Sequence, residues 1–296
     1  MVLHVGDRLL TADASPWDPL ANKSVVVLGS DGWACVSYSG LAHVDSKPTD
    51  QWLAEVLSDQ AAGPPSSGGL GMMFGGNFVP RVGLAFARLR AAIEGDFTRQ
   101  PPAQRSLGMH VEITGFIFRR RRKPCPRGRP FMRRYSHIGL ANSQLEERAL
   151  PRYWHWCRQI QVGGVGVDPG DAKRIALASL GSAGFKNQDD CERTLVECIR
   201  AVSRDNDTVG ADCMSIVLSR PGDVRVRFLP DPASDSGQTA YTPWILAPNA
   251  MVPPMVLTGA LPHLQAGPFH VEFDRLPPLR PSHTLTAGSQ PRRPFP

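Results

Sequence analysis

The stretch from residue 5 to residue 57 constrains the fold of this 296-residue chain most, because it predicts an antiparallel ribbon followed by a helix. Gly6-Asp7 and Asp31-Gly32 are dipeptides typical of turns, and apolar or β-branched residues flank both. Pro48 then suits a first helical turn, and apolar residues recur at helical spacing up to Leu57. We therefore expect the helix 48–57 to lie across a sheet whose strands span 9–12, 24–28 and 33–37.

Further along the chain, hydrophobic periodicity and turn residues predict helices and strands that arrive in pairs. The predicted helices span 80–93, 171–180 and 189–202, of which the last two form a helical hairpin. The predicted strands span 109–118, 134–141, 212–219 and 224–230, of which the last two form a hairpin. Cys198 falls on the apolar stripe of the helix 189–202, so we expect it to be buried.

This order of elements predicts an α/β protein of the α+β kind, a four-layer αββα sandwich of two antiparallel sheets. Antiparallel ribbons have one face to bury, and paired helices can cover the outer faces when the sheets stack. A doubly wound parallel sheet is the alternative, and it is disfavoured because the strands come in hairpins. The sandwich is expected in residues 1–230. A proline-rich C-terminal extension follows over 231–296, with short edge strands laid on the body and a disordered end.

The net charge of +6 is concentrated in residues 119–134, which we call the basic segment. It carries nine Lys or Arg residues and no acid, so the rest of the chain sums to −3 (+6 minus +9). Three prolines and a glycine predict an irregular loop. One interpretation is a solvated hairpin tip, and the other is an electrostatic contact with a polyanion or an acidic protein partner. The second would use Arg119, Arg120, Arg121, Arg122, Lys123, Arg127 and Arg129.

Composition argues against several other classes of protein. The sequence holds no apolar run long enough for a membrane span, no signal-peptide pattern and no glycine-rich phosphate motif. We therefore expect an unexported, cytoplasmic protein without a nucleotide site or a cofactor. The six cysteines are dispersed without a C-x-x-C pair, which indicates reduced thiols and no metal site. A cysteine nucleophile paired with one of the eight histidines stays open, although no local motif marks it.

Short motifs in both halves of the chain resemble those of the proteasome-type N-terminal-nucleophile (Ntn) hydrolases. An aspartate ends the first strand of the ribbon (LLTAD, Asp13), and a lysine opens the next strand (NKSVVV, Lys23). In the second half, a glycine turn (162–166), two helices, a polar turn (RDNDTVG, 204–210) and a hairpin follow in the family's order. The resemblance spans residues 5–230 and implies the same four-layer sandwich.

For function, the resemblance implies hydrolysis of amide or peptide bonds. In such enzymes a chain-terminal Thr, Ser or Cys attacks the carbonyl carbon, and its own α-amine accepts the proton. Lys23 would be the electrostatic supporter, with Asp13 as its partner, and Asp205 and Thr208 would support the amine. The serine of the family's glycine turn is absent here, because glycines occupy its place.

The attacking residue of that family has no counterpart in the sequence as printed. It lies further before the aspartate than the twelve residues that precede Asp13, and residues 1–10 include no Thr, Ser or Cys. We therefore expect no hydrolysis by the Ntn route, unless the true N-terminus lies upstream. The alternative class is a catalytically silent relative, which keeps the sandwich for assembly as a homo-oligomer or for binding through the basic segment.

Overall fold

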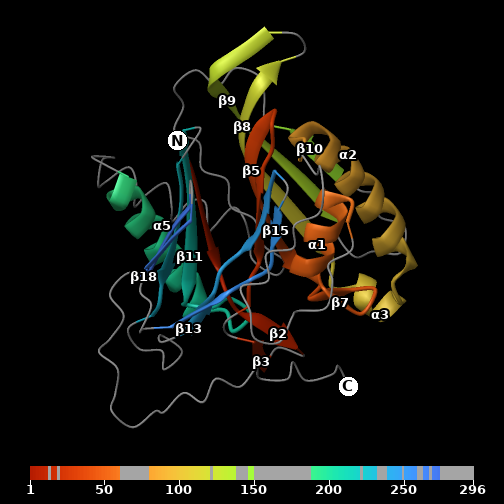
Figure 1. The fold of residues 1–296 in the computed structure, drawn as a ribbon. Helices are drawn as coiled ribbons and strands as arrows, with labels where there is room; N and C mark the ends of the chain where they lie inside the picture. The colour runs from red at the N-terminus through yellow and green to blue at the C-terminus, as the bar shows by residue number, and fades with distance from the viewer. Residues whose placement is uncertain are drawn as a thin grey trace.

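The computed structural model describes residues 1–12, 15–18, 21–60, 80–120, 123–137, 146–149, 188–220, 223–231, 239–248, 250–258, 263–266 and 269–273. They form a mixed α+β fold with two main sheets (Figure 1). The five-stranded sheet has the order β1 (Val2–Asp7), β11 (Cys213–Arg220), β12 (Asp223–Leu229), β18 (Phe269–Phe273) and β17 (His263–Ala266). The seven-stranded sheet has the order β10 (Glu146–Ala149), β9 (Lys123–His137), β8 (Met109–Arg120), β5 (Gly32–Gly40), β4 (Ser24–Leu28), β14 (Trp244–Ala247) and β15 (Ala250–Val252).

The remaining elements are small sheets and helices. Three two-stranded sheets pair β2 (Leu10–Ala12) with β3 (Ser15–Asp18), β6 (His43–Val44) with β7 (Lys47–Pro48), and β13 (Thr239–Tyr241) with β16 (Val256–Thr258). The described helices are α1 (Thr49–Ser58), α2 (Val82–Ala92), the π-helix η1 (Ile93–Phe97), α3 (Pro102–Arg105) and α5 (Gln188–Ser203). Within the described ranges, no helix combines the length and the apolar character needed to cross a bilayer.

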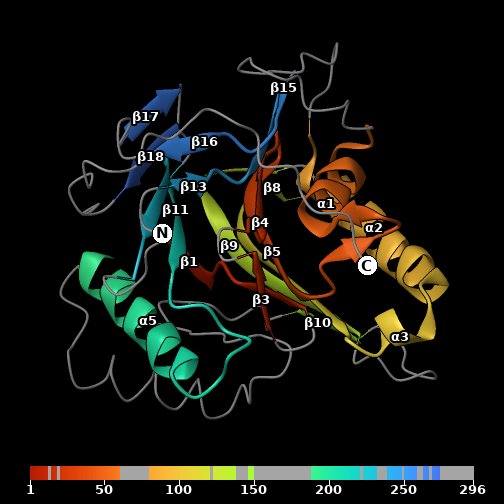
Figure 2. The same cartoon turned by 90° about the horizontal axis from the view of Figure 1, so that it is seen from below.

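Strand β4 shows how the core divides, because successive side chains of a strand point to opposite faces. Val26 belongs to a buried cluster that joins the seven-stranded sheet to Ile216 and Phe228 of the five-stranded sheet. Val27 belongs to a second cluster, which includes Leu53 and other apolar residues of α1 and α2. Helix α5 packs against β1 and β11, and Figure 2 shows it on the opposite side of the molecule from α1 and α2.

Local patterns predicted several of these elements correctly. The strands 24–28 and 33–37 fall in β4 and β5, and the helices 48–57, 80–93 and 189–202 correspond to α1, α2 and α5. The hairpin of 212–219 with 224–230 is β11 with β12. Cys198 is 8% exposed on α5, so its predicted burial is confirmed. The predicted helix 171–180 and the glycine turn 162–166 lie outside the described residues.

The start of the predicted ribbon is wrong in two respects. Residues Val2–Asp7 form β1 and pair antiparallel with β11, from Val2 opposite Leu218 to Asp7 opposite Cys213, so Gly6-Asp7 is not a turn. Strand β2 pairs with β3 in a separate small sheet and does not join β4. The physical reason is that the partner of β1 lies about two hundred positions further along the chain, where no local pattern can indicate it.

The C-terminal region supplies strands inside both main sheets, which corrects the expectation of edge strands laid on the body. β14 lies between β4 and β15 and runs parallel to β4, and β18 lies between β12 and β17 and runs parallel to β12. Each main sheet therefore contains one parallel pair, so the sheets are mostly antiparallel and not wholly so. The indole N–H of Trp244 donates to Asp50 of α1 at 3.2 Å, which also ties β14 to a helix.

The basic segment is a paired hairpin, which corrects the predicted irregular loop. β8 extends to Arg120 and β9 begins at Lys123, with these two residues paired. Strand β10 pairs with β9 only over 133–136, so the prolines of β9 lie where its other edge has no strand partner among the described residues. Proline is tolerated on such an edge, where its missing N–H can face solvent. The hairpin is irregular at two places. Gly128 has a left-handed backbone conformation (φ 65°), and the strand register shifts before Arg119.

Candidate functional site

Lys23 and Asp7 form a partly buried ion pair where β1 ends and β4 is about to begin. Lys23 Nζ lies 2.9 Å from Asp7 Oδ2, and the two side chains are 12% and 21% exposed. Sequence reasoning assigned the partner role to Asp13, which lies outside the described residues. It missed Asp7 because a Gly-Asp dipeptide is typical of a turn. The apolar and β-branched residues of VLHV before it were the available signal that a strand precedes this aspartate.

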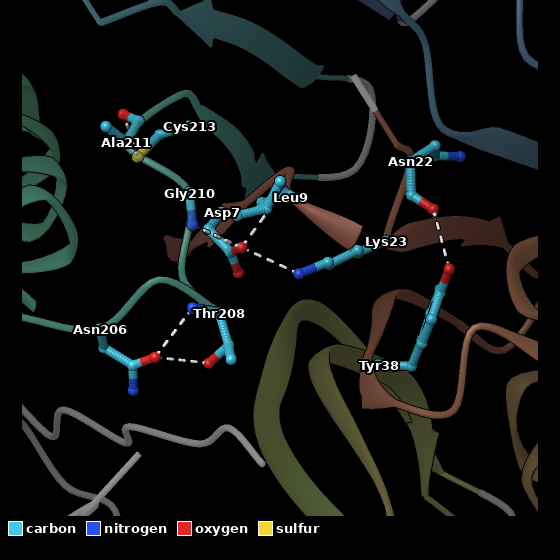
Figure 3. A network of polar contacts seen from close by, with 10 residues as sticks. All are labelled: Asp7, Leu9, Asn22, Lys23, Tyr38, Asn206, Thr208, Gly210, Ala211 and Cys213. Atoms are coloured by element: carbon cyan, nitrogen blue, oxygen red, sulfur yellow. Dashed lines mark hydrogen bonds and ion pairs between the residues drawn. The ribbon is translucent and has the colours of Figure 1, made fainter. Parts of the chain in front are cut away.

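The carboxylate of Asp7 connects its own segment to two others, one at Lys23 and one at Gly210 (Figure 3). Besides Lys23 Nζ, its Oδ2 accepts hydrogen bonds from the backbone N–H of Leu9 and of Gly210, each at 3.2 Å. Gly210 closes the polar turn 204–210. A side chain there would not fit, because a Cβ at this position would lie 2.7 Å from Leu9 Cβ. The structure therefore brings the predicted lysine next to the end of the predicted polar turn.

Asp205 and Thr208 are both exposed in that polar turn. The backbone N–H and the hydroxyl of Thr208 donate to Asn206 Oδ1, at 2.9 and 2.6 Å (Figure 3). The backbone N–H of Asp205 donates to the Val202 carbonyl at 3.1 Å, which ties the turn to the end of α5. Among the described residues, Lys23 Nζ bonds to Asp7 alone. Asp205 and Thr208 thus shape the turn without contacting the lysine.

The backbone around Lys23 is fixed from the side of β5. The Tyr38 N–H donates to the Lys23 carbonyl at 3.0 Å, and the Tyr38 hydroxyl lies 3.4 Å from the Asn22 carbonyl, to which it donates. The side-chain oxygen of Asn22 accepts the N–H of Ser24 at 3.1 Å. Because both flanks are held, Lys23 presents its ammonium group to Asp7 from a rigid strand start.

Two cysteines, Cys213 of β11 and Cys35 of β5, are buried in the sheets. Cys213 lies opposite Asp7 in the β1–β11 register, and burial, with a smaller contribution from Asp7, raises the pKa of its thiol. Burial also raises the pKa of Cys35 to about 12, against a lowering effect of its hydrogen bond with Ser24. Both thiols are therefore protonated at neutral pH, and a protonated thiol is a poor nucleophile. For these two residues, the structure argues against the cysteine-nucleophile alternative.

Of the predicted polyanion-binding residues, Arg119 and Arg120 lie in β8 and Lys123, Arg127 and Arg129 lie in β9, whereas Arg121 and Arg122 lie outside the described residues. In the same hairpin, Arg134 pairs with Glu112, and Arg133 contacts Glu147 at 3.0 Å. The arginines at the base of the basic segment are thus engaged within the sheet. Any contact of this segment with a partner would use its outer part, residues 119–129.

Comparison with known proteins gives only a weak structural likeness. No family model matches the sequence, and no curated protein matches it. Among solved structures, the Gly-1 mutant of Anbu from Hyphomicrobium sp. strain MC1 is similar, with 10% identity and a TM-score of 0.44 over 79% of this chain and 84% of that chain. A second Anbu structure from the same strain gives 11% identity with the same TM-score and coverage. At a TM-score below 0.5, these likenesses carry no argument for fold or function.

Proposed function

We propose that this chain has the proteasome-type Ntn fold, a four-layer αββα sandwich, and that Lys23 and Asp7 are the supporting ion pair of an amide-hydrolase centre. The observation that carries the proposal is that two distant segments meet at Asp7, whose carboxylate accepts from Lys23 and Gly210 as well as from the nearby Leu9. The shared cluster between the sheets, and the helices on the outer side of each, support the sandwich.

The ion pair suits a supporting role in acyl transfer. An ammonium held 2.9 Å from a carboxylate is a fixed positive charge, and such a charge stabilises negative charge that develops on a nearby nucleophile or oxyanion. By resemblance, the turn with Asp205 and Thr208 is the second part of this centre. Asp7 takes the partner role that the sequence pattern assigned to Asp13.

The test is an amidase assay on the purified chain with a panel of fluorogenic peptide amides. If the centre is catalytic, Lys23→Met should lower the rate on any responsive substrate about a hundredfold, as the loss of one electrostatic stabiliser does in other acyl-transfer enzymes. Lys47→Met is the matched control, because Lys47 is an exposed lysine paired with Glu55. A responsive substrate with equal rates in the two variants would contradict the role of Lys23.

A specific observation favours a second candidate, a catalytically silent relative that binds a partner. Lys23 Nζ touches no hydroxyl or thiol among the described residues, and the buried thiols of Cys35 and Cys213 are protonated. The centre then has an electrostatic stabiliser, Lys23, and no identified nucleophile among the described residues. A panel without a single responsive substrate would favour this candidate over the hydrolase.

On the second candidate, the outer part of the basic segment contacts a polyanion or an acidic protein. Replacing Arg119, Arg120, Arg121 and Arg122 with serine should abolish retention on heparin, because clustered arginines neutralise sulfates and phosphates. The melting temperature should stay within about two degrees if these four side chains make no packing contacts, since exposed charges contribute little to stability.

The matched control removes four exposed arginines from other surfaces. Arg81, Arg90, Arg193 and Arg204 are all exposed, and their replacement by serine changes the net charge by the same amount. Retention that depends on the segment should survive in this control. Equal retention of wild type and the segment variant would remove the polyanion interpretation.

A further inference from the structure

The guanidinium group of Arg200 lies at the point where α5 meets the ends of two strands. Its Nε donates to the Ala211 carbonyl at 3.3 Å, just before β11. Its Nη2 donates to the carbonyls of Leu229 at 3.3 Å and Pro230 at 2.8 Å, at the end of β12. The side chain is 17% exposed, so these bonds form largely out of water. The guanidinium group thus joins α5 to the start of β11 and to the end of β12.

Arg200 holds the chain directly after the residue that supports Asp7. Ala211, whose carbonyl Arg200 holds, directly follows Gly210, whose N–H donates to Asp7 Oδ2 (Figure 3). The chain beyond Ala211 is also fixed, because Asp212 accepts the N–H of Asp231 at 2.6 Å. The bond to Asp7 and the bond to Arg200 therefore hold the two peptide units on either side of Gly210–Ala211, which fixes the chain between them.

The pKa of the Cys213 thiol gives a second observation, besides these hydrogen bonds, on where Arg200 and Asp7 lie. Asp7 raises the pKa of the Cys213 thiol and Arg200 lowers it, both acting after the larger effect of burial. The positive charge of Arg200 and the negative charge of Asp7 thus act on one sulfur atom.

We propose that Arg200 is a positioning residue for the Lys23–Asp7 pair, acting through the Ala211 carbonyl and the Gly210 N–H. This inference rests on the proposed function, in which that pair is the supporting centre. Arginine suits the role because its planar group carries five donors in a fixed arrangement, whereas lysine carries one rotating ammonium group. An arginine that only stabilised the fold would leave the environment of Lys23 unchanged.

The test measures the reactivity of Lys23 directly, so that its outcome does not depend on hydrolysis. The native chain is acetylated with a low dose of N-acetoxysuccinimide, and each lysine is quantified by mass spectrometry. In Arg200→Met, acetylation of Lys23 relative to Lys47 should rise about fivefold, the factor that follows from the loss of one ordinary hydrogen bond. Arg200→Lys keeps the charge but cannot reach the three carbonyls together, so it should show a smaller rise.

Two controls decide between positioning and general stabilisation. Arg193→Met removes an exposed arginine from the same helix and should leave the Lys23 ratio unchanged. Glu197→Gln removes the fourth contact of Arg200, at 3.2 Å, and should also leave it unchanged. If Arg200→Met does not fold, the ratio is read in Arg200→Lys. A wild-type Lys23 ratio in whichever Arg200 variant folds would overturn the inference, even if amidase activity were found and depended on Lys23.

Discussion

Gly115→Ala should destabilise the protein by about 4 kcal/mol or more, which would leave a marginally stable domain largely unfolded. Gly115 lies in β8 opposite Ala34 of β5, in the middle of the seven-stranded sheet. A Cβ at this position would lie 2.0 Å from the Trp33 carbonyl oxygen and 2.8 Å from Ala34 Cα. Both are backbone atoms of the neighbouring strand, so no side-chain rotation can relieve the overlap, and the two strands would have to separate.

Urea unfolding of Gly115→Ala and of Gly95→Ala tests this expectation. Gly95 lies in η1, and a Cβ added there meets no atom within 4 Å. Gly95→Ala should therefore be neutral or raise the free energy of unfolding by up to about 1 kcal/mol, since alanine loses less backbone entropy than glycine on folding. Equal midpoints for the two variants would show that β5 and β8 do not approach each other this closely.

Glu192→Ala should have the second largest effect, a loss of about 3–5 kcal/mol, because it removes one partner of a buried ion pair. Glu192 is 2% exposed on the face of α5 that packs on the five-stranded sheet. Its carboxylate accepts hydrogen bonds from the Ser215 hydroxyl of β11 and from Arg227 of β12. The variant would bury the hydroxyl without this acceptor and leave Arg227 with less negative charge nearby, so the docking of α5 should weaken.

The matched control for Glu192 is Glu197→Ala on the same helix. The Glu197 side chain is 55% exposed and pairs only with Arg200 among the described residues, so its loss should change the free energy of unfolding by less than about 1 kcal/mol. Glu192→Gln should fall between the two, because the amide keeps the shape and one acceptor oxygen. Similar losses for Glu192→Ala and Glu197→Ala, measured by urea unfolding, would argue against a buried network under α5.

Only part of the site around the Lys23–Asp7 pair could be predicted from the sequence. Lys23 could be identified because NKSVVV, with a lysine directly before a strand, resembles a short motif of the proteasome-type family. Asp7 could not, because a Gly-Asp dipeptide has the same appearance in a turn and at the end of a strand. Arg200 could not be predicted either, because its three partners are backbone carbonyls, which every residue type carries. The contacts that organise the centre are mostly to main-chain atoms.

The sequence by itself determined the elements whose pattern is local. The β4–β5 hairpin, the helices α1, α2 and α5, and the β11–β12 hairpin follow from turn residues and from apolar spacing within a few residues. Only the tertiary structure decided that β1 pairs with β11, that β14 and β18 enter the sheets in parallel, and that the prolines of β9 lie in a paired strand. Strand pairing joins backbone groups that every residue type carries, so the choice of partner is made by the burial of whole faces and not by any short motif.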